Sequence, residues 1–377
     1  MPAQRHTLIC TVGTSLFSNL GRLSETNEEK PDNWKTIKAA YASEDWGGLC
    51  NELERLNPEA RLCGAEINTI QEVVSRNKLR LEQLFFLVSD THAGRCTGAL
   101  LQRYYERRPD LALRFVEYSI VDDLQDKNPK RFKTHGLRNL VHCIGKCIRR
   151  AGGPEYVAID ATGGYKAQIA LGVLMGQALD IPVFYKFERF TEIIDFPPLP
   201  ISLDYDLLGR YADLLIAFER SKVFTSGEIG DIDPKLRTLL TDVEIEGQTL
   251  YEINPVGLIY LEGFRYRNPK PPALLPADNK KEPHFPKDHH SPNGFKNFVR
   301  KVWLENEWII TAKGFGYFKQ KALQEIGFKV WQNEAGYRLI GTYVDRNNFG
   351  GRFQLCLTDE SHRALVWAAD LLNRKYA

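Results

Sequence analysis

Two glycine-rich segments of this sequence carry the residue types that bind phosphate. The first is Asp160-Ala161-Thr162-Gly163-Gly164-Tyr165-Lys166, which follows the apolar run 156–159 and precedes an apolar helical pattern over 167–179. A buried strand that ends in a glycine-rich turn and then enters a helix presents backbone N–H groups to an anion. Lys166, in the first turn of the predicted helix, adds a positive charge. This segment therefore predicts a phosphate-binding loop.

The N-terminal segment repeats the arrangement. Residues 8–12 predict a strand, and Gly13, Thr14 and Ser15 follow it with one glycine and two hydroxyl groups. The carboxyl ends of parallel strands meet at the same edge of a sheet, so both loops are expected to hold one phosphate-bearing ligand. A third loop, Ser89–Arg95, follows the apolar run 84–88 and falls at the same edge. It adds a third group of candidate ligand contacts.

In this order and at this separation, the motifs Thr11–Ser15 and Asp160–Lys166 resemble the CARF domain, the sensor of cyclic oligoadenylates in type III CRISPR immunity. The segment Glu66–Ile70 also fits the helix that this family has after its first insertion. The resemblance covers roughly residues 5–200. It implies a Rossmann-like parallel sheet and a cyclic oligoadenylate activator, expected to be cyclic tetra-adenylate. A cyclic ligand of this kind is symmetric, so a homodimer could bind it with the same loops from both subunits. The expected ligand contacts are Gly13, Thr14, Ser15, Ser89, Thr91, Arg95, Thr162, Gly163, Gly164 and Lys166.

The sensor site could also cleave its ligand. Cleavage of RNA without metal needs the ribose 2′-hydroxyl aligned with the scissile phosphodiester, together with charge stabilisation of the transition state. Ser15 and Lys166 would be the smallest catalytic set for such a ring nuclease. Some relatives cleave their ligand and others only bind it, and the residues leave both alternatives open.

Composition limits the protein class. A chain of 377 residues predicts two or three domains, and 43% hydrophobic residues can fill their cores. The net charge of +2 means that nucleic-acid contacts must come from local patches. The 7 cysteines form no CxxC pair, so no zinc or other metal site is expected. Scattered cysteines, without a signal peptide or an apolar run of membrane length, predict a cytoplasmic protein without membrane contact.

Alternating strand and helix patterns divide the chain. Strands are predicted at 111–118 and 183–187, besides those named above, with helices at 64–77, 97–105 and 137–150 and a helical insertion over 21–60. Such alternation predicts a parallel sheet covered on both faces. The expected fold class is α/β, with a Rossmann-like CARF domain, a winged-helix-like module and a small α+β, RelE-like domain. The expected boundaries are 1–202 for the sensor, 203–266 for the module, 267–293 for a linker and 294–377 for the effector.

The middle segments have distinct compositions. Helices over 207–224 and 235–240, a strand at 249–253 and a helix from 254 follow an order that resembles a winged helix. We interpret this module as a packing and dimerisation element, because Asp233–Asp242 has too little positive charge for a major-groove reader. The segment 267–293 is rich in proline and should behave as an extended, partly stiff tether.

The C-terminal segment is basic and aromatic. Residues 287–377 hold Lys/Arg in excess over Asp/Glu. Helices are predicted at 295–306, 314–326 and 361–374, and strands at 328–332, 337–344 and 352–357. The segment has neither the Arg-x4–6-His motif of HEPN ribonucleases nor the E-x-K arrangement of metal-dependent PD-(D/E)xK nucleases.

This order of elements resembles the RelE-type mRNA interferases, which occur fused to CARF sensors and cleave mRNA on the ribosome without metal. The resemblance implies a metal-independent endoribonuclease that binds RNA, without a cofactor. The available groups are Lys313, Lys319, Lys321, Tyr337, Arg338, Arg346, Arg352 and His362. Of these, Arg338 and Arg352 are the preferred phosphate-binding groups, at the edge of a sheet, with Lys313 as a further candidate. Tyr337 and His362 are candidates for proton transfer.

Two functions of different kinds stay open at this point. In one, the chain is a cyclic-oligoadenylate-activated ribonuclease of antiviral defence. In the other, it is a ring nuclease or a sensor and regulator without effector nuclease activity. A catalytic C-terminal domain requires its basic groups to converge, whereas a structural domain would scatter them.

Overall fold

A computed structural model describes residues 4–26, 30–187, 190, 192–220, 222–230, 232–245, 247–268, 274–286, 291–319, 325–334 and 336–377. The chain divides into two compact units. The N-terminal unit comprises Met1–Ile201 and Leu258–Tyr266, and the C-terminal unit comprises Ser202–Gly257 and Arg267–Ala377. Each unit is described below by itself.

The described part of the N-terminal unit is built around a six-stranded sheet of order β3-β2-β1-β4-β5-β6. All neighbouring strands are parallel except β5 and β6. The predicted parallel sheet is confirmed, and its strand order is that of doubly wound dinucleotide-binding folds. The strands are β1 (Thr7–Thr11), β2 (Gln83–Ser89), β3 (Phe115–Val121), β4 (Val157–Asp160), β5 (Val183–Tyr185) and β6 (Ile194–Phe196).

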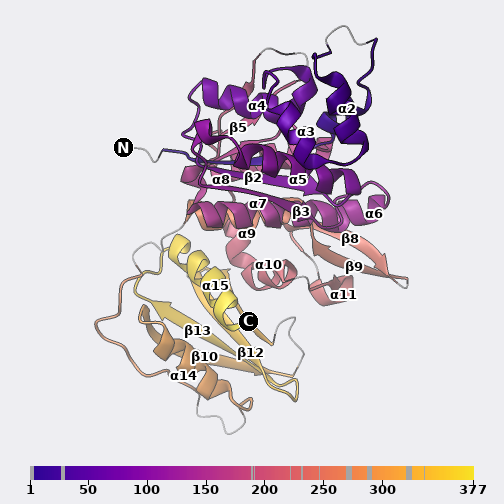
Figure 1. Cartoon of the computed structure of the whole chain (residues 1–377). Coiled ribbons are helices and arrows are strands. Elements are labelled where there is room, and N and C mark those ends of the chain that lie inside the picture. Colours follow the sequence, from indigo (N-terminus) through magenta and orange to yellow (C-terminus); the bar gives the residue numbers. More distant parts are fainter. Residues whose placement is uncertain are drawn as a thin grey trace. The chain divides into compact units, whose positions relative to one another are not determined.

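Helices cover both faces of this sheet, which explains why its central strands are continuous apolar runs. On one face, α5 packs on β2 and β3, and α3 packs on α5. On the other face, α7 and α8 pack on each other and on β1. Figure 1 shows α2, α3 and α4 together on one side of the sheet. The helices are α1 (Ser15–Gly21), α2 (Trp34–Ala42), α3 (Trp46–Leu53), α4 (Gly64–Ser75), α5 (His92–Glu106), α6 (Pro129–Arg131), α7 (Leu137–Ala151) and α8 (Lys166–Leu179).

One predicted strand is displaced along the chain. The pattern predicts a strand over 111–118, whereas β3 spans Phe115–Val121 and the residues before it form a short 3-10 turn, Pro109–Leu111. Pro109 fixes the backbone of that turn, and Ala112 adopts φ 48°. The pairing of Gln83 with Phe115 then sets where the strand begins.

The C-terminal unit begins with a small helical and antiparallel region. Its described strands pair in the order β7-β9-β8. Along the chain, α10 is followed by β7, two one-turn helices and the β8–β9 hairpin; assignment of this region as a winged helix stays a prediction. The elements are α9 (Tyr205–Arg210), α10 (Ala212–Glu219), β7 (Phe224–Thr225), α11 (Ser226–Ile229), α12 (Pro234–Arg237), β8 (Leu240–Ile245), β9 (Gln248–Ile253) and α13 (Pro255–Arg267). Most of α13, Leu258–Tyr266, groups with the N-terminal unit.

The rest of the described C-terminal unit is built around a four-stranded antiparallel sheet of order β10-β13-β12-β11. Its apolar face, which includes Phe353, packs against Phe295 and Phe298 of α14. The helix α15 packs on β11 and β12. The elements are α14 (Phe295–Glu305), β10 (Ile309–Phe318), β11 (Ile326–Asn333), β12 (Gly336–Val344), β13 (Gly350–Leu357) and α15 (His362–Tyr376).

The helix predicted over 314–326 is wrong for its first residues. Residues up to Phe318 belong to β10, which pairs with β13 along its length. Gly314 and Gly316 lower the helix propensity of this stretch, and the pairing with β13 shifts register between them. Residues 320–324, including Lys321, lie outside the described residues.

The prediction that residues 267–293 form an extended, partly stiff tether is wrong for residues 274–286, which are bonded to the rest of the unit. Backbone N–H groups of Ala277, Lys281 and His284 donate to carbonyl oxygens of Glu307, Ile310 and Ala312. Lys280 donates to the carbonyl oxygens of Trp303 and Asn306. The segment therefore follows β10, because its backbone groups find partners despite the prolines. Residues 269–273 and 287–290 lie outside the described part.

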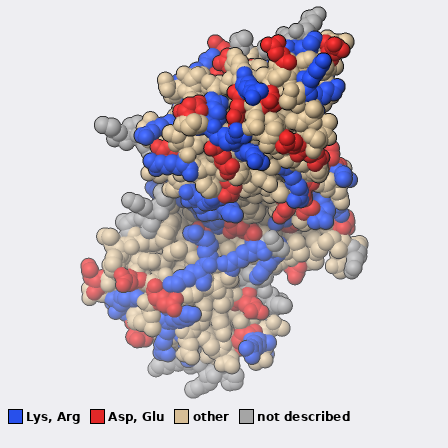
Figure 2. Space-filling model, in the orientation of Figure 1, with Lys and Arg blue, Asp and Glu red and all other residues tan. Residues whose placement is uncertain are grey.

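Among the described residues, no helix combines the length and apolarity needed to span a membrane. On the face drawn in Figure 2, positive and negative side chains are interspersed, in keeping with the small net charge.

Candidate functional site

The two glycine-rich loops meet at the centre of the parallel sheet. The strand β1 lies between β2 and β4, so the loops after β1 and β4 leave neighbouring strands at their carboxyl ends. The Thr11 hydroxyl donates to the Gly163 carbonyl oxygen at 2.7 Å. In the strand order 3-2-1-4-5-6, this is the point where successive connections turn to opposite sides, and it is the usual ligand position in such sheets.

Glycine is required where the loops touch. A Cβ at Gly13 would lie 2.7 Å from the Gly164 nitrogen. A Cβ at Gly163 would overlap a Glu66 carboxylate oxygen and lie 2.7 Å from both the Gly13 nitrogen and the Thr11 carbonyl oxygen. Gly164 has φ 99°, which disfavours other residues. The predicted close approach of backbone is therefore present, and it joins the two loops to each other.

A buried carboxylate, that of Glu66 on α4, lies beneath the N-terminal loop. The Gly13 N–H donates to Glu66 Oε1 at 2.7 Å, and the Ser15 hydroxyl lies 3.3 Å from Oε2. Burial raises the pKa of this carboxyl, and the hydrogen bond from Gly13 opposes that effect. The sequence marks Glu66 only as part of a helix, so its contact with Gly13 and Ser15 is new information from the structure.

A second buried carboxyl, Asp160, lies at the end of β4. Its Oδ1 accepts the Thr162 N–H at 3.0 Å and so shapes the turn that follows. Burial raises the pKa of Asp160 to about 7, opposed by its hydrogen bonds with Thr162 and reinforced by the negative charge of Glu66. The buried Glu66 and Asp160 carboxylates therefore hold both loops in place by accepting hydrogen bonds from loop backbone N–H groups.

A small pocket opens beside the N-terminal loop. Its lining residues are Ser15, Asn19, Arg61, Ala65, Asn68 and Lys186. Of the predicted ligand contacts, Ser15 is the one that lines it. Lys186 comes from the chain directly after β5, the strand next to β4. The carboxyl ends of parallel strands meet at one edge of a sheet, and Lys186 directly follows such a strand, so the same argument from the sequence could have identified it.

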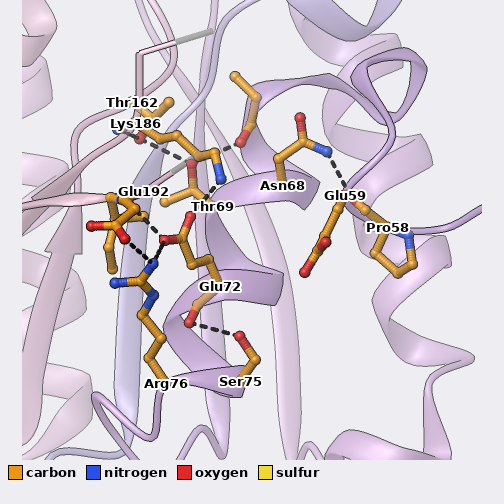
Figure 3. A network of polar contacts seen from close by, with 12 residues as sticks. Pro58, Glu59, Asn68, Thr69, Glu72, Ser75, Arg76, Thr162, Lys186 and Glu192 are labelled. Atoms are coloured by element: carbon orange, nitrogen blue, oxygen red, sulfur yellow. Dashed lines mark hydrogen bonds and ion pairs between the residues drawn. The ribbon is translucent and has the colours of Figure 1, made fainter. Parts of the chain in front are cut away.

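Lys186 is held by a polar network that Figure 3 shows from close by. Its Nζ pairs with the buried Glu72 carboxylate, which Arg76 also contacts at 2.9 Å. The backbone N–H of Lys186 donates to the Thr162 hydroxyl at 3.0 Å. The Thr69 hydroxyl donates to the same oxygen at 3.1 Å. The network therefore joins α4 to the loops after β4 and β5.

The remaining predicted ligand residues have other local roles. Lys166 is the first residue of α8 and is exposed, and it does not line the pocket. Thr14 is the N-cap residue of α1. Thr91 caps α5 by accepting the Gly94 N–H at 3.0 Å, and its hydroxyl lies 2.9 Å from that of Ser89. Arg95 pairs with Asp90 at 2.5 Å. Whether these residues contact a ligand stays a prediction.

The C-terminal candidates fall into two groups on opposite faces of the four-stranded sheet. Lys313 pairs in register with Gln354, and Arg352 lies two residues before Gln354 on β13, so these side chains share one face. Arg338, on β12, lies on this same face by its register with β13. Arg338 and Arg352 occupy the two central strands, so the expectation that they lie at the sheet edge is wrong. Pairing with β10 and β11 on either side makes β12 and β13 central.

Tyr337 and His362 form the second group. Tyr337 alternates with Arg338 and points to the other face, where its ring lies 4.1 Å from that of His362. His362 begins α15, and its Nδ1 lies 3.1 Å from Asp206 Oδ1. The structure therefore brings the two predicted proton-transfer residues together and adds a carboxylate that the sequence did not indicate. Lys319 is exposed after β10, and Arg346 is exposed between β12 and β13.

Comparisons with known proteins connect part of the chain to a CRISPR-associated family. Residues 61–199 match the sequence profile of a family described as CRISPR-associated protein (Cas_APE2256). No curated protein matches the chain. Among solved structures, the chain is similar to Can2 from Sulfobacillus thermosulfidooxidans in complex with cyclic tetra-adenylate, at 10% identity over 92% of this chain and 76% of that chain. The TM-score is 0.26, which is too low to support an argument.

Proposed function

We propose that this chain is a CARF-type sensor of cyclic oligoadenylate, with cyclic tetra-adenylate as the expected ligand, and that its C-terminal unit is a ribonuclease which the ligand activates. The observation that carries the sensor part is the contact between the Gly13 and Gly163–Gly164 loops at the centre of a parallel sheet. The family match over residues 61–199 supports the CRISPR-associated context.

The chemistry of the site supports a ligand with several phosphates and amino-substituted bases. Small residues let the backbone approach a phosphate, and Lys166 is exposed beside the second loop. The pocket offers the amides of Asn19 and Asn68 and the Lys186 ammonium group. The Asn68 amide nitrogen already donates to the carbonyl oxygens of Pro58 and Ala60, so Asn68 would accept from the N–H of a base through its oxygen. The ammonium group favours the anionic backbone.

His362 supports the effector part of the proposal. A histidine held by a carboxylate through one ring nitrogen can exchange a proton through the other, which is the arrangement of a general acid or base. Asp206 supplies the carboxylate, and Tyr337 lies against the ring. Arg338, Arg352 and Lys313 share the opposite face of the sheet, with the exposed Phe315 and Trp331 rings, which suit base stacking. RNA bound there would lie across the sheet from His362, so the two faces are alternative sites for the proposed ribonuclease.

The decisive experiment measures translation in a cell-free extract with cyclic tetra-adenylate present and absent. The wild type should inhibit translation and cleave mRNA only with ligand, and any cleavage of free RNA should persist in EDTA. Weaker inhibition by His362→Ala would place cleavage on the face of Tyr337 and His362, whereas weaker inhibition by Arg338→Ala and Arg352→Ala would place the RNA on the opposite face. Lys301→Ala is the matched control, because Lys301 is exposed on α14, the helix that covers the apolar face of the sheet.

Each outcome of this experiment separates the alternatives. Equal inhibition by all variants would mean that the effector site lies elsewhere. Absence of inhibition by the wild type would reject the effector and leave the sensor and regulator alternative. Free RNA and translating ribosomes, supplied in parallel, distinguish a general ribonuclease from a ribosome-dependent one.

A second candidate activity is cleavage of the cyclic ligand by the sensor. Ser15 favours it, because its hydroxyl lines the pocket and is held at 3.3 Å from Glu66 Oε2. A ring nuclease of this kind should work in EDTA and leave a 2′,3′-cyclic phosphate, since the 2′-hydroxyl is the nucleophile. Full activity of the double variant Ser15→Ala, Lys166→Ala, or strict dependence on a divalent ion, would reject this mechanism.

A further inference from the structure

Three metal-ligating side chains of different types meet on the surface of the N-terminal unit, among residues that the proposed function does not use. Glu44 lies in the turn between α2 and α3, while His92 and Cys96 lie on the first turns of α5. One ligand atom from each residue lies within 4.8 Å of the others. The absence of a CxxC pair led to the expectation of no metal site, and the structure changes that expectation.

The spacing of the cluster is close to that of a metal site. His92 Nε2 lies 3.8 Å from Cys96 Sγ and 4.0 Å from Glu44 Oε1. In a tetrahedral zinc site, the bond lengths of about 2.0–2.3 Å place neighbouring ligand atoms about 3.4–3.5 Å apart. The His92 and Glu44 side chains are 77% and 58% exposed, so small rotations can close the difference.

The backbone around the cluster is already fixed. His92 and Cys96 are four residues apart on a helix, so their side chains share one face. Thr91 caps this helix, and Asp45 caps α3 directly after Glu44 by accepting the Gly48 N–H at 2.9 Å. The helix α3 also packs on α5. Binding a metal would therefore require side-chain movement without reordering of the chain.

The chemistry of the donors selects the metal. A thiolate, an imidazole and a carboxylate together suit zinc, whereas magnesium and calcium prefer oxygen ligands alone.

We propose that Glu44, His92 and Cys96 bind a zinc ion through Oε1, Nε2 and Sγ, with a fourth position open to water. The ion would fasten the α2–α3 turn to the start of α5. Each ligand comes from this chain, so the site is complete in one copy.

The test uses the full chain, stripped with a chelator and kept reduced, and titrated with zinc chloride in a calorimeter. One zinc ion should bind per chain. His92→Ala and Cys96→Ser should each weaken binding by more than the about 10- to 100-fold that loss of an outer-sphere partner costs. The control Cys143→Ser replaces a similarly half-buried cysteine on α7 and should leave the affinity unchanged.

Cobalt provides a second readout that does not depend on affinity. Cobalt(II) bound to the wild type should show a thiolate-to-metal charge-transfer band, which Cys96→Ser removes and Cys143→Ser keeps. Absence of stoichiometric zinc binding, equal affinity in Cys96→Ser, or a cobalt spectrum without thiolate character would each overturn the proposal.

Discussion

Buried carboxyl groups decide which backbone donors of the loops a ligand can use. The Gly13 N–H already donates to Glu66, and the Thr162 N–H already donates to Asp160. Both amides belong to the motifs that predict phosphate contact. Because each amide donates mainly one hydrogen bond, the carboxylates orient the loops, and the proposed ligand would have to use other donors nearby.

At the residue scale, Asp160 should make stability depend on pH. Its folded-state pKa of about 7 exceeds the ordinary value of 3.8, so the folded state binds the proton more tightly. This contribution is fully present below about pH 4 and is lost as the pH rises to about 7. Between about pH 4 and pH 7, the urea midpoint of Asp160→Asn should therefore decline less than that of the wild type.

The control for this measurement is Asp32→Asn, which changes an exposed carboxyl in the same unit. It should keep the decline of the wild type. An unchanged pH dependence in Asp160→Asn would show that another group dominates the titration.

Two lysines near the site should behave differently when replaced. Lys166 is exposed, and Lys166→Ala should weaken cyclic tetra-adenylate binding by about 1.5–3 kcal/mol without loss of stability, since that is the range for a hydrogen bond to a charged group. Lys186→Ala should weaken binding and also lower the free energy of unfolding, because the buried Glu72 loses a partner.

Calorimetry and urea unfolding of both variants distinguish these effects. Unchanged affinity in Lys166→Ala, together with weaker binding in Lys186→Ala, would place the ligand over the pocket and away from the start of α8. Unchanged affinity in both variants would count against the proposed site.

At the scale of elements, the two loops act as one structure because glycine backbone lies against glycine backbone. Gly163→Ala would place a Cβ against Glu66, Gly13 and Thr11. The loops must then separate, at a cost of about 1–3 kcal/mol or more, and the ligand site should be lost. Thermal unfolding and ligand titration of the variant measure both effects.

Gly21→Ala is the matched control, because a Cβ there meets atoms of Tyr41 at an ordinary 3.8 Å. Its stability and affinity should stay close to those of the wild type. Normal ligand binding by Gly163→Ala would show that the contact between the loops is not needed for recognition.

At the scale of the whole molecule, a symmetric cyclic ligand and one set of loops per chain predict a homodimer. Each subunit would present the same two loops to its half of the ligand. Light scattering with cyclic tetra-adenylate should give twice the chain mass of 43.1 kDa. A monomer at micromolar concentration, with ligand bound, would contradict this prediction.

Local patterns were sufficient for much of the N-terminal unit. Apolar runs predicted β1, β2 and β4 to within about two residues, and alternation with helices predicted the parallel sheet. The C-terminal unit was less predictable, since β10 depends on its pairing with β13, and residues 274–286 depend on backbone partners in and near β10. Such pairings join residues far apart in the chain and leave little local signal.

The sequence by itself determined the alternation of strands and helices in most of the N-terminal unit and the position of two glycine-rich loops at one edge of a sheet, because hydrophobic period and turn residues act over a few positions. The tertiary structure alone decided that Glu66 lies beneath Gly13, and that Tyr337 meets His362. It also decided that Glu44 meets His92. These relations depend on how separate elements pack, so they exist only once the chain has folded.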